Sequence, residues 1–282
     1  MRQKLWGYLQ QILPHKIVSI FAGQLAEAKS PWIKRFLIKR FIHAYQVDLS
    51  NALEENPDMY KTFNDFFTRQ IKPQARPIDT NPNTIISPVD GCIAEMGSMN
   101  QNRLLQAKNF YFTLESLLGD ESIAKHFVNG SFATLYLAPH NYHRVHMPLD
   151  GKLIQTNYIP GKLFSVNRLT ADIIPQLYSR NERLVCLFDT VIGPMALVFV
   201  GAMIVGNICT TWEGSVPRSN KTQETHFNQS IFFKKGDELG HFKLGSTIIL
   251  LFPFNSIIWQ NNQTLDRELE FGQVLGKLKA NT

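Results

Sequence analysis

The chain has 282 residues, of which 44% are hydrophobic and 18% charged. This composition is typical of one large or two modest globular domains, and it excludes a disordered or collagen-like protein. The chain has three cysteines, an odd number, at the widely spaced positions Cys92, Cys186 and Cys209. They therefore fit neither a disulfide framework nor a CxxC zinc site. This cysteine usage indicates a reducing, cytosolic environment.

The net charge of +6 is concentrated in the first 50 residues. That segment holds eight Lys and Arg against two acidic residues, so the remaining 232 residues hold 21 of each sign. A nucleic-acid-binding protein usually carries its positive charge over a binding face, so the distribution argues against a nucleic-acid partner. Basic residues interleaved with aromatic ones instead suit an anionic membrane surface. The residues that we expect at the membrane are Trp6, Trp32, Arg35, Phe36 and Lys39.

Residues 1 to about 65 are predicted to be helical. Apolar residues recur at helical spacing on both sides of Pro14, and a second helix is predicted over 31–45. Polar residues interrupt any apolar core of the length that a secretory signal needs, so the segment stays on the mature protein. The alternative to membrane contact is a helical subdomain whose apolar faces pack only on the protein core.

Residues 190–212 carry no charge and are long enough to span a bilayer as a helix. Gly193-Pro194, Gly201 and Gly206 divide this stretch into short runs rich in Val and Ile. Such runs are typical of buried strands joined by turns, so we expect strands here and not a membrane span.

Beyond an extended connection at 72–88, short apolar runs alternate with turn residues. Because long helical patterns do not alternate with these runs, an antiparallel β-sandwich or a barrel-like core is favoured over a parallel sheet. The predicted class is therefore α+β, with short helices at 112–118 and 170–178. The strands are expected at 92–96, 132–137, 152–158, 183–188, 197–208, 230–233 and 246–252.

Three segments could carry chemistry. In Ser87-Pro-Val-Asp90-Gly91 the aspartate, taken alone, is best explained as a turn cap. His140, His143 and His146 lie three residues apart and on a helix could bind a metal, but Pro139 and Pro148 bracket them. If this stretch is extended, His143 and His146 point to opposite faces and serve different purposes, and no metal site is predicted.

The third segment, Leu244-Gly245-Ser246-Thr247, precedes a strongly apolar run and taken alone is a hairpin. A Gly-Ser peptide at such a turn can also cleave itself, because the glycine carbonyl is unhindered and the serine hydroxyl can attack it. The resulting ester can eliminate and lose ammonia, which leaves a pyruvoyl group. That group forms a Schiff base with an amine and accepts electrons during decarboxylation.

Together these segments resemble phosphatidylserine decarboxylases of the bacterial, membrane-associated type. The resemblance runs from about residue 60 to 255, in the order of that family's motifs. The matching stretches include Asn64-Asp-Phe-Phe-Thr-Arg69, 87–91, Tyr142-His-Arg-Val-His-Met-Pro148, 160–167, 180–183, 186–190 and Phe242-Lys-Leu-Gly-Ser-Thr247.

The resemblance implies that Asp90 orients His146 and that His146 takes the proton of Ser246 as the hydroxyl attacks Gly245. Cleavage would give a β chain, 1–245, and an α chain, 246–282, which remain partners. Ser246 would then supply the pyruvoyl cofactor. His143 is the candidate for protonating the product carbanion. The candidate head-group contacts are Tyr142, Ser165 and Asn167.

The expected organisation is a membrane-associating helical region, 1–65, followed by a β-rich catalytic domain, 66–282. The substrate would be phosphatidylserine, met at the cytoplasmic face of the bacterial inner membrane by a peripheral protein, with a homodimer left open. Two other classes compete with this interpretation. A serine hydrolase would use Asp90, His146 and an intact Ser246, although no GxSxG elbow is present. An uncleaved β-rich binding module would use the same motifs as strand turns.

Overall fold

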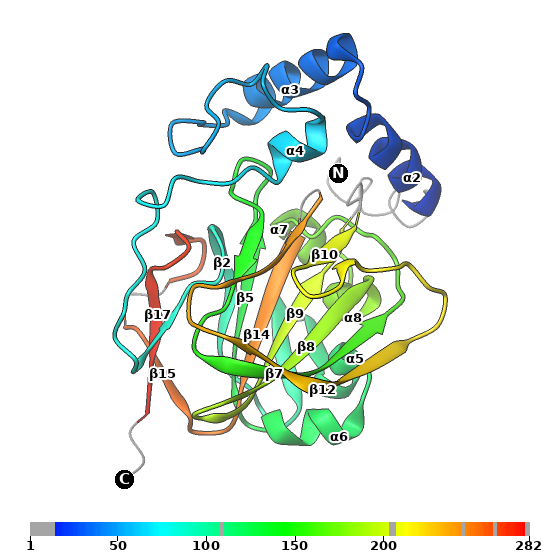
Figure 1. Ribbon diagram of the computed structural model, residues 1–282. Helices are drawn as coiled ribbons and strands as arrows, with labels where there is room; N and C mark the ends of the chain where they lie inside the picture. The colour runs from blue at the N-terminus through cyan, green and yellow to red at the C-terminus, as the bar shows by residue number, and fades with distance from the viewer. Residues whose placement is uncertain (1–14, 108–109, 203–206, 244–245, 262–263, 280–282) are drawn as a thin grey trace.

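The computed structural model describes residues 15–107, 110–202, 207–243, 246–261 and 264–279. Three helices lie over one end of a body made mostly of strands (Figure 1). We call these helices, α2 (His15–Ala26), α3 (Pro31–Tyr45) and α4 (Phe63–Phe67), the helical cover. The predicted helix over 31–45 is confirmed, whereas Trp6 and the segment before Pro14 lie outside the described residues.

Local sequence explains where the helices of the cover begin and end. Pro31 occupies the first turn of α3, where its missing N–H costs nothing, and Gln46 ends the helix in a left-handed conformation. Thr62 and Asp65 form a reciprocal capping box at the start of α4. Together with Tyr60 and Val47, the apolar residues of the cover form a small core of their own around Phe63, Phe66 and Phe67.

The body is built around an eight-stranded sheet in the order β12-β7-β8-β9-β14-β5-β2-β16, in which every neighbouring pair is antiparallel. Smaller sheets, β1-β17-β15, β11-β10-β13-β6 and β3-β4, lie around it. The strands are β1 (Thr84–Ile86), β2 (Gly91–Ser98), β3 (Arg103–Ala107), β4 (Phe110–Thr113), β5 (Ser131–Leu137), β6 (Arg144–His146), β7 (Gly151–Ile159), β8 (Arg183–Thr190), β9 (Gly193–Val200), β10 (Ile208–Thr210), β11 (Gly214–Ser215), β12 (Gln223–Phe233), β13 (Glu238–Phe242), β14 (Ser246–Phe252), β15 (Ile257–Trp259), β16 (Glu268–Leu269) and β17 (Val274–Leu278).

The predicted α+β class with mainly antiparallel strands is therefore confirmed. The large sheet keeps two edges, β12 and β16, and does not close on itself. At its centre β14 is buried along its whole length, which explains its unbroken run of β-branched and apolar residues. The side chains on both faces of this sheet form the main core of the protein.

The uncharged stretch at 190–212 contains strands, as predicted, but the single strand expected at 197–208 is wrong: β9 ends at Val200, β10 begins at Ile208, and residues 203–206 lie outside the described ranges. β8 and β9 make a tight hairpin in which Thr190 pairs with Gly193, and Gly193 takes the positive φ of 89° that the turn requires. β10 follows further along the chain. Within the described ranges, no helix has both the length and the apolar character needed to cross a membrane.

The predicted short helices are partly corrected. Residues 110–113 continue as strand β4, and the helix α5 (Leu114–Leu118) begins only after Thr113, whose side chain caps it. The helix expected at 170–178 is two single turns, α7 (Arg168–Ala171) and α8 (Leu177–Arg180), separated around Pro175. The remaining turns are α6 (Glu121–Ala124) and a 3₁₀ turn at Lys125–Phe127.

Candidate active site

Ser246 is the first residue of β14 and lines a cavity together with residues of the helical cover. It pairs with Leu137 of β5 and is fully buried. Its Oγ has no hydrogen-bond partner among the described residues. A buried hydroxyl left unpaired costs about 1–3 kcal/mol, so this position is unfavourable for folding alone and suggests a chemical role.

A cavity of about 620 Å³ separates the helical cover from the body, and Ser246 forms part of its wall. The cover contributes mostly apolar side chains, including those of Leu25, Phe41 and Phe67. The body contributes Ser165 and Asn167, two of the head-group contacts predicted from the sequence. Arg40 of α3 is the only charged side chain among the described residues that line this cavity. An apolar pocket with a few polar groups at one end suits an amphipathic ligand.

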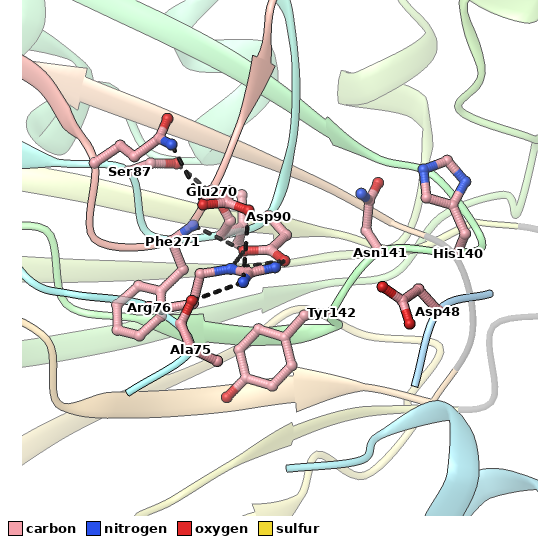
Figure 2. A network of polar contacts seen from close by, with 12 residues as sticks. Asp48, Ala75, Arg76, Ser87, Asp90, His140, Asn141, Tyr142, Glu270 and Phe271 are labelled. Atoms are coloured by element: carbon pink, nitrogen blue, oxygen red, sulfur yellow. Dashed lines mark hydrogen bonds and ion pairs between the residues drawn. The ribbon is translucent and has the colours of Figure 1, made fainter. Parts of the chain in front are cut away.

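Asp90 lies in the turn before β2 and is held by a nearly buried ion pair. Arg76 donates from Nε to Oδ1 at 3.0 Å and from Nη2 to Oδ2 at 2.6 Å, as Figure 2 shows. The backbone N–H of Phe271 donates to the same Oδ1 at 2.8 Å. The residue after Asp90 is a glycine, because a Cβ at position 91 would lie 2.3 Å from the carbonyl oxygen of Tyr136.

His146, in β6, lies in the same cluster as Asp90. Its backbone N–H donates to the carbonyl of Pro88 at 2.8 Å, and its ring stacks on Phe271 at 3.7 Å. Nδ1 lies 2.8 Å from the carbonyl of Gly236 and must donate, because a carbonyl only accepts. Nε2 then accepts from the Tyr142 hydroxyl at 3.0 Å. Burial lowers the pKa of His146, which keeps the ring neutral.

His143 is fully buried behind the cavity wall, with its ring 4.0 Å from that of Phe67. Nδ1 donates to the carbonyl of Asn141 at 2.8 Å, so the free lone pair is on Nε2. Nε2 has no partner among the described residues. Burial lowers the pKa of His143 to about 3. His143 is therefore a neutral imidazole with an available acceptor atom.

The strand order brings these groups to the same end of the sheet. Leu137 pairs with Ser246 on one side, and Gly91 packs against Tyr136 and Leu137 on the other. Ser246 and the turn that carries Asp90 are therefore about two strand spacings, roughly 10 Å, apart. The described contacts place no hydrogen bond between Asp90 and His146, or between His146 and Ser246. Gly245 lies outside the described residues.

Other predicted residues are placed with different neighbours. Tyr142 is nearly buried and contacts His146 instead of lining the cavity. The Asn167 side chain also caps α7, where it accepts from the N–H of Thr170 at 2.9 Å. Trp32 and Phe36 are 86% and 69% exposed on the outer face of α3.

Lys39 is exposed on α3, whereas Arg35 makes a bidentate ion pair with Asp58. Among the described residues, no group of three His, Cys, Asp or Glu is placed to hold a metal ion.

Sequence reasoning missed Arg76 and Phe271. Both approach Asp90 from distant parts of the chain, and Phe271 comes from the C-terminal strand region. The only available signal was general: a buried aspartate requires a cation or several donors. Arg40 belongs to the helix predicted at 31–45, but its place at the cavity depends on how α3 packs against the body.

Together the fold and the site define a class of protein: an antiparallel β body in which a buried serine opens into an apolar cavity beneath a helical cover. Comparison with known proteins agrees with this description. The family model for phosphatidylserine decarboxylase matches residues 63–277, and a second family model, described as PSD, matches residues 5–46.

The phosphatidylserine decarboxylase proenzyme of Azotobacter vinelandii is 48% identical over 283 residues, covering 98% of this chain and 99% of that protein. The proenzymes of Saccharophagus degradans and Marinobacter nauticus are 46% and 48% identical, each with 99% of both chains covered. The chain belongs to the phosphatidylserine decarboxylase family.

Proposed function

We propose that this protein is a proenzyme that cleaves itself between Gly245 and Ser246 and then decarboxylates phosphatidylserine to phosphatidylethanolamine. The observation that carries the proposal is the buried, unpartnered Oγ of Ser246 at the wall of an apolar cavity. The family relationship supports it, because the related proteins are named proenzymes of this decarboxylase. On this proposal, 1–65 is the membrane-associating region and 66–282 the catalytic domain.

Cleavage begins when Ser246 Oγ attacks the carbonyl carbon of Gly245. A base takes the hydroxyl proton, the peptide nitrogen leaves with a proton, and an ester joins Gly245 to the serine side chain. Loss of the Cα proton of Ser246 then breaks the bond between its Cβ and Oγ. Gly245 leaves as a carboxylate that keeps this oxygen. Water replaces the nitrogen of the remaining dehydroalanine and ammonia leaves, which converts Ser246 to a pyruvoyl group.

We assign the base for cleavage to His146, oriented by Asp90, and the later proton transfer to His143. Support for the first assignment is the shared cluster of Asp90, Phe271 and His146. Support for the second is the free Nε2 of His143, which can accept a proton and return it. Because burial disfavours the charged ring, protonated His143 would be a strong donor.

The site fits a pyruvoyl group at position 246, because the side chain there is small, buried and unbonded among the described residues. Such a group supplies an electrophilic carbonyl that accepts electrons as a carboxylate leaves as carbon dioxide. Around it, Ser165 and Asn167 are positioned to orient the polar head of the lipid. Arg40 carries the charge that suits its phosphate. The apolar cover residues exclude water from position 246 and leave room for an acyl chain.

Mass measurement of the purified, denatured protein tests the cleavage. We expect fragments of residues 1–245 and 246–282, the second with a blocked, pyruvoyl-bearing start. Ser246→Ala and Asp90→Asn should each leave one full-length chain, because the first lacks the nucleophile and the second the charge that orients the base. Ser256→Ala, on the same segment, should cleave normally. An intact wild-type chain that hydrolyses esters would instead support a serine hydrolase, and an intact chain that binds a partner would support a binding module.

Release of carbon dioxide from vesicles containing phosphatidylserine tests the lyase reaction. Arg40→Gln should raise KM about tenfold or more with little change in kcat, because loss of a charged hydrogen bond to phosphate costs at least about 1.5 kcal/mol. An unchanged KM would contradict the role given to Arg40, whereas an absence of carbon dioxide with processed wild-type protein would contradict the activity.

The outer face of α3 is the basis for proposing peripheral membrane binding at the cytoplasmic face. Trp32 and Phe36 are large, apolar and exposed one helical turn apart. Lys39 and Arg40 lie on the same helix and would be attracted to anionic lipid. A substrate that remains in a bilayer requires such a contact, and the cavity lies directly beneath this helix.

A further inference from the structure

Among the described residues, one ion pair connects the helical cover to the segment that precedes Ser246. Lys243 Nζ lies 2.7 Å from Oε1 of Glu27, although the two residues are 216 positions apart in the chain. Glu27 immediately follows α2. Asn64 of α4 donates from Nδ2 to the same oxygen at 2.9 Å, and Asn64 is itself nearly buried. Glu27 thus joins two helices of the cover to one lysine of the body.

Both partners of this pair are charged. Burial disfavours the charge of Glu27, but hydrogen bonds from Lys243 and Asn64 outweigh it and lower the pKa of Glu27. Burial also disfavours the charge of Lys243, and the hydrogen bond and charge of Glu27 outweigh it and raise the pKa of Lys243. Each side chain remains partly exposed, so the direct contribution of the pair to stability is small. The ion pair is therefore of interest for where it lies, between the helical cover and the segment before Ser246, and not for its contribution to stability.

Lys243 is three residues from Ser246, so at most about 10 Å of chain separates them. Backbone hydrogen bonds hold the chain at and before Lys243. The N–H of Lys243 donates to the carbonyl of Asn207 at 3.2 Å, and the N–H of Phe242 donates to the carbonyl of His143 at 3.2 Å. The lysine side chain is therefore a direct link between the helical cover and this short segment, beside the indirect contact through Phe67 and His143.

We propose that Glu27 is a positioning residue for self-cleavage: through Lys243 it aligns the peptide before Ser246 only when the helical cover is seated on the body. This inference rests on the proposed self-cleavage. An attack geometry displaced by about 1 Å can slow an intramolecular reaction by as much as a hundredfold. The coupling delays formation of the reactive carbonyl until the apolar cover that excludes water is in place. After cleavage the same pair holds the new end of the β chain against α2.

The test follows cleavage of the freshly synthesised full-length chain in cell-free translation on denaturing gels. Glu27→Gln and Lys243→Met should each slow cleavage about tenfold, within the range that a small misalignment produces. The double reversal Glu27→Lys with Lys243→Glu should recover the rate to within about threefold. Recovery is feasible because the Asn64 amide can turn its carbonyl toward a lysine. Reversal would also restore a pair that only stabilises the fold, so the coupling further requires that the single variants slow cleavage without lowering the unfolding temperature.

Glu55→Gln is the matched control, since Glu55 forms a similar ion pair with Lys72 at 2.6 Å and neither residue lies in a helix of the cover or in the segment before Ser246. Thermal unfolding in a Ser246→Ala background checks that each variant folds. If Glu27→Gln fails to fold, Lys243→Met and the reversal decide the question. Folded single variants that cleave at the wild-type rate, or a folded reversal that stays slow, would overturn the coupling alone. A wild-type chain that never cleaves would overturn both the coupling and the proposed function.

Discussion

At the scale of single residues, burial sets the protonation of the two histidines of the site. His143 and His146 are three positions apart, and both lose water on folding without gaining an acidic hydrogen-bond partner among the described contacts. Burial disfavours the imidazolium, so the pKa of each is lowered. Both rings are therefore neutral at neutral pH, as a general base must be.

This arrangement predicts that stability falls in mild acid. The folded pKa of His143 is about 3, below the ordinary value of about 6.5, so the unfolded chain binds more protons between these values. Stability is fully present above about pH 6.5 and declines as pH falls. At pH 4.5 the loss from His143 is on the order of 3 kcal/mol. Chemical denaturation of the Ser246→Ala chain at several pH values measures this decline.

His143→Gln in the same background should make the decline shallower, leaving the contributions of His146 and the carboxylates. The control is His126→Gln, because His126 is exposed and its replacement should not change the slope. A His143→Gln chain with the full decline would contradict the assigned protonation state.

At the scale of elements, α3 presents different chemistry on its two faces. Ile38 is 1% exposed and packs in the small core of the helical cover, whereas Trp32 and Phe36 are exposed on the outer face. A soluble surface has no need for two large apolar side chains one turn apart on a basic helix. The outer face therefore suits insertion at the boundary between lipid head groups and acyl chains.

Trp32→Ser with Phe36→Ser should reduce sedimentation with phosphatidylserine-containing vesicles more than tenfold. Burial of each aromatic side chain in the interface contributes about 1.5–3 kcal/mol, so the loss of two exceeds one decade in affinity. Phe254→Ser is the control, since Phe254 is 68% exposed but follows the far end of β14. Equal losses in the two variants would contradict a specific membrane face on α3.

At the scale of the whole molecule, the segment after Ser246 is woven into the body. β14 lies in the interior of the large sheet, with β5 on one side and β9 on the other. The later strands β16 and β17 pair with β2 and β1, which come from the opposite end of the catalytic region. A cut before Ser246 therefore leaves both pieces joined by backbone hydrogen bonds and a shared core.

We expect the cleaved chains to stay together. In native mass spectrometry the fragments 1–245 and 246–282 should appear as one species near 32 kDa, the mass of the chain. They should separate only in denaturant, because release of β14 would expose seven buried residues and two rows of hydrogen-bonding groups. A free 37-residue fragment under native conditions would contradict this expectation.

The sequence by itself determined the longer elements, the family resemblance and the candidate residues of the site. Period and turn residues identified the helix at 31–45, the strand beginning at Ser246 and the strands within 190–212, because these signals are local. The motifs around Asp90, His143, His146 and Ser246 were visible for the same reason.

Only the tertiary structure decided which groups meet. It gave Asp90 the partner Arg76, placed Tyr142 on His146, and brought Glu27 to Lys243. These contacts depend on the order of the strands and on how the helical cover packs against the body. Both follow from the burial of apolar faces that are distant in the sequence. No pattern within a short window of sequence encodes that packing.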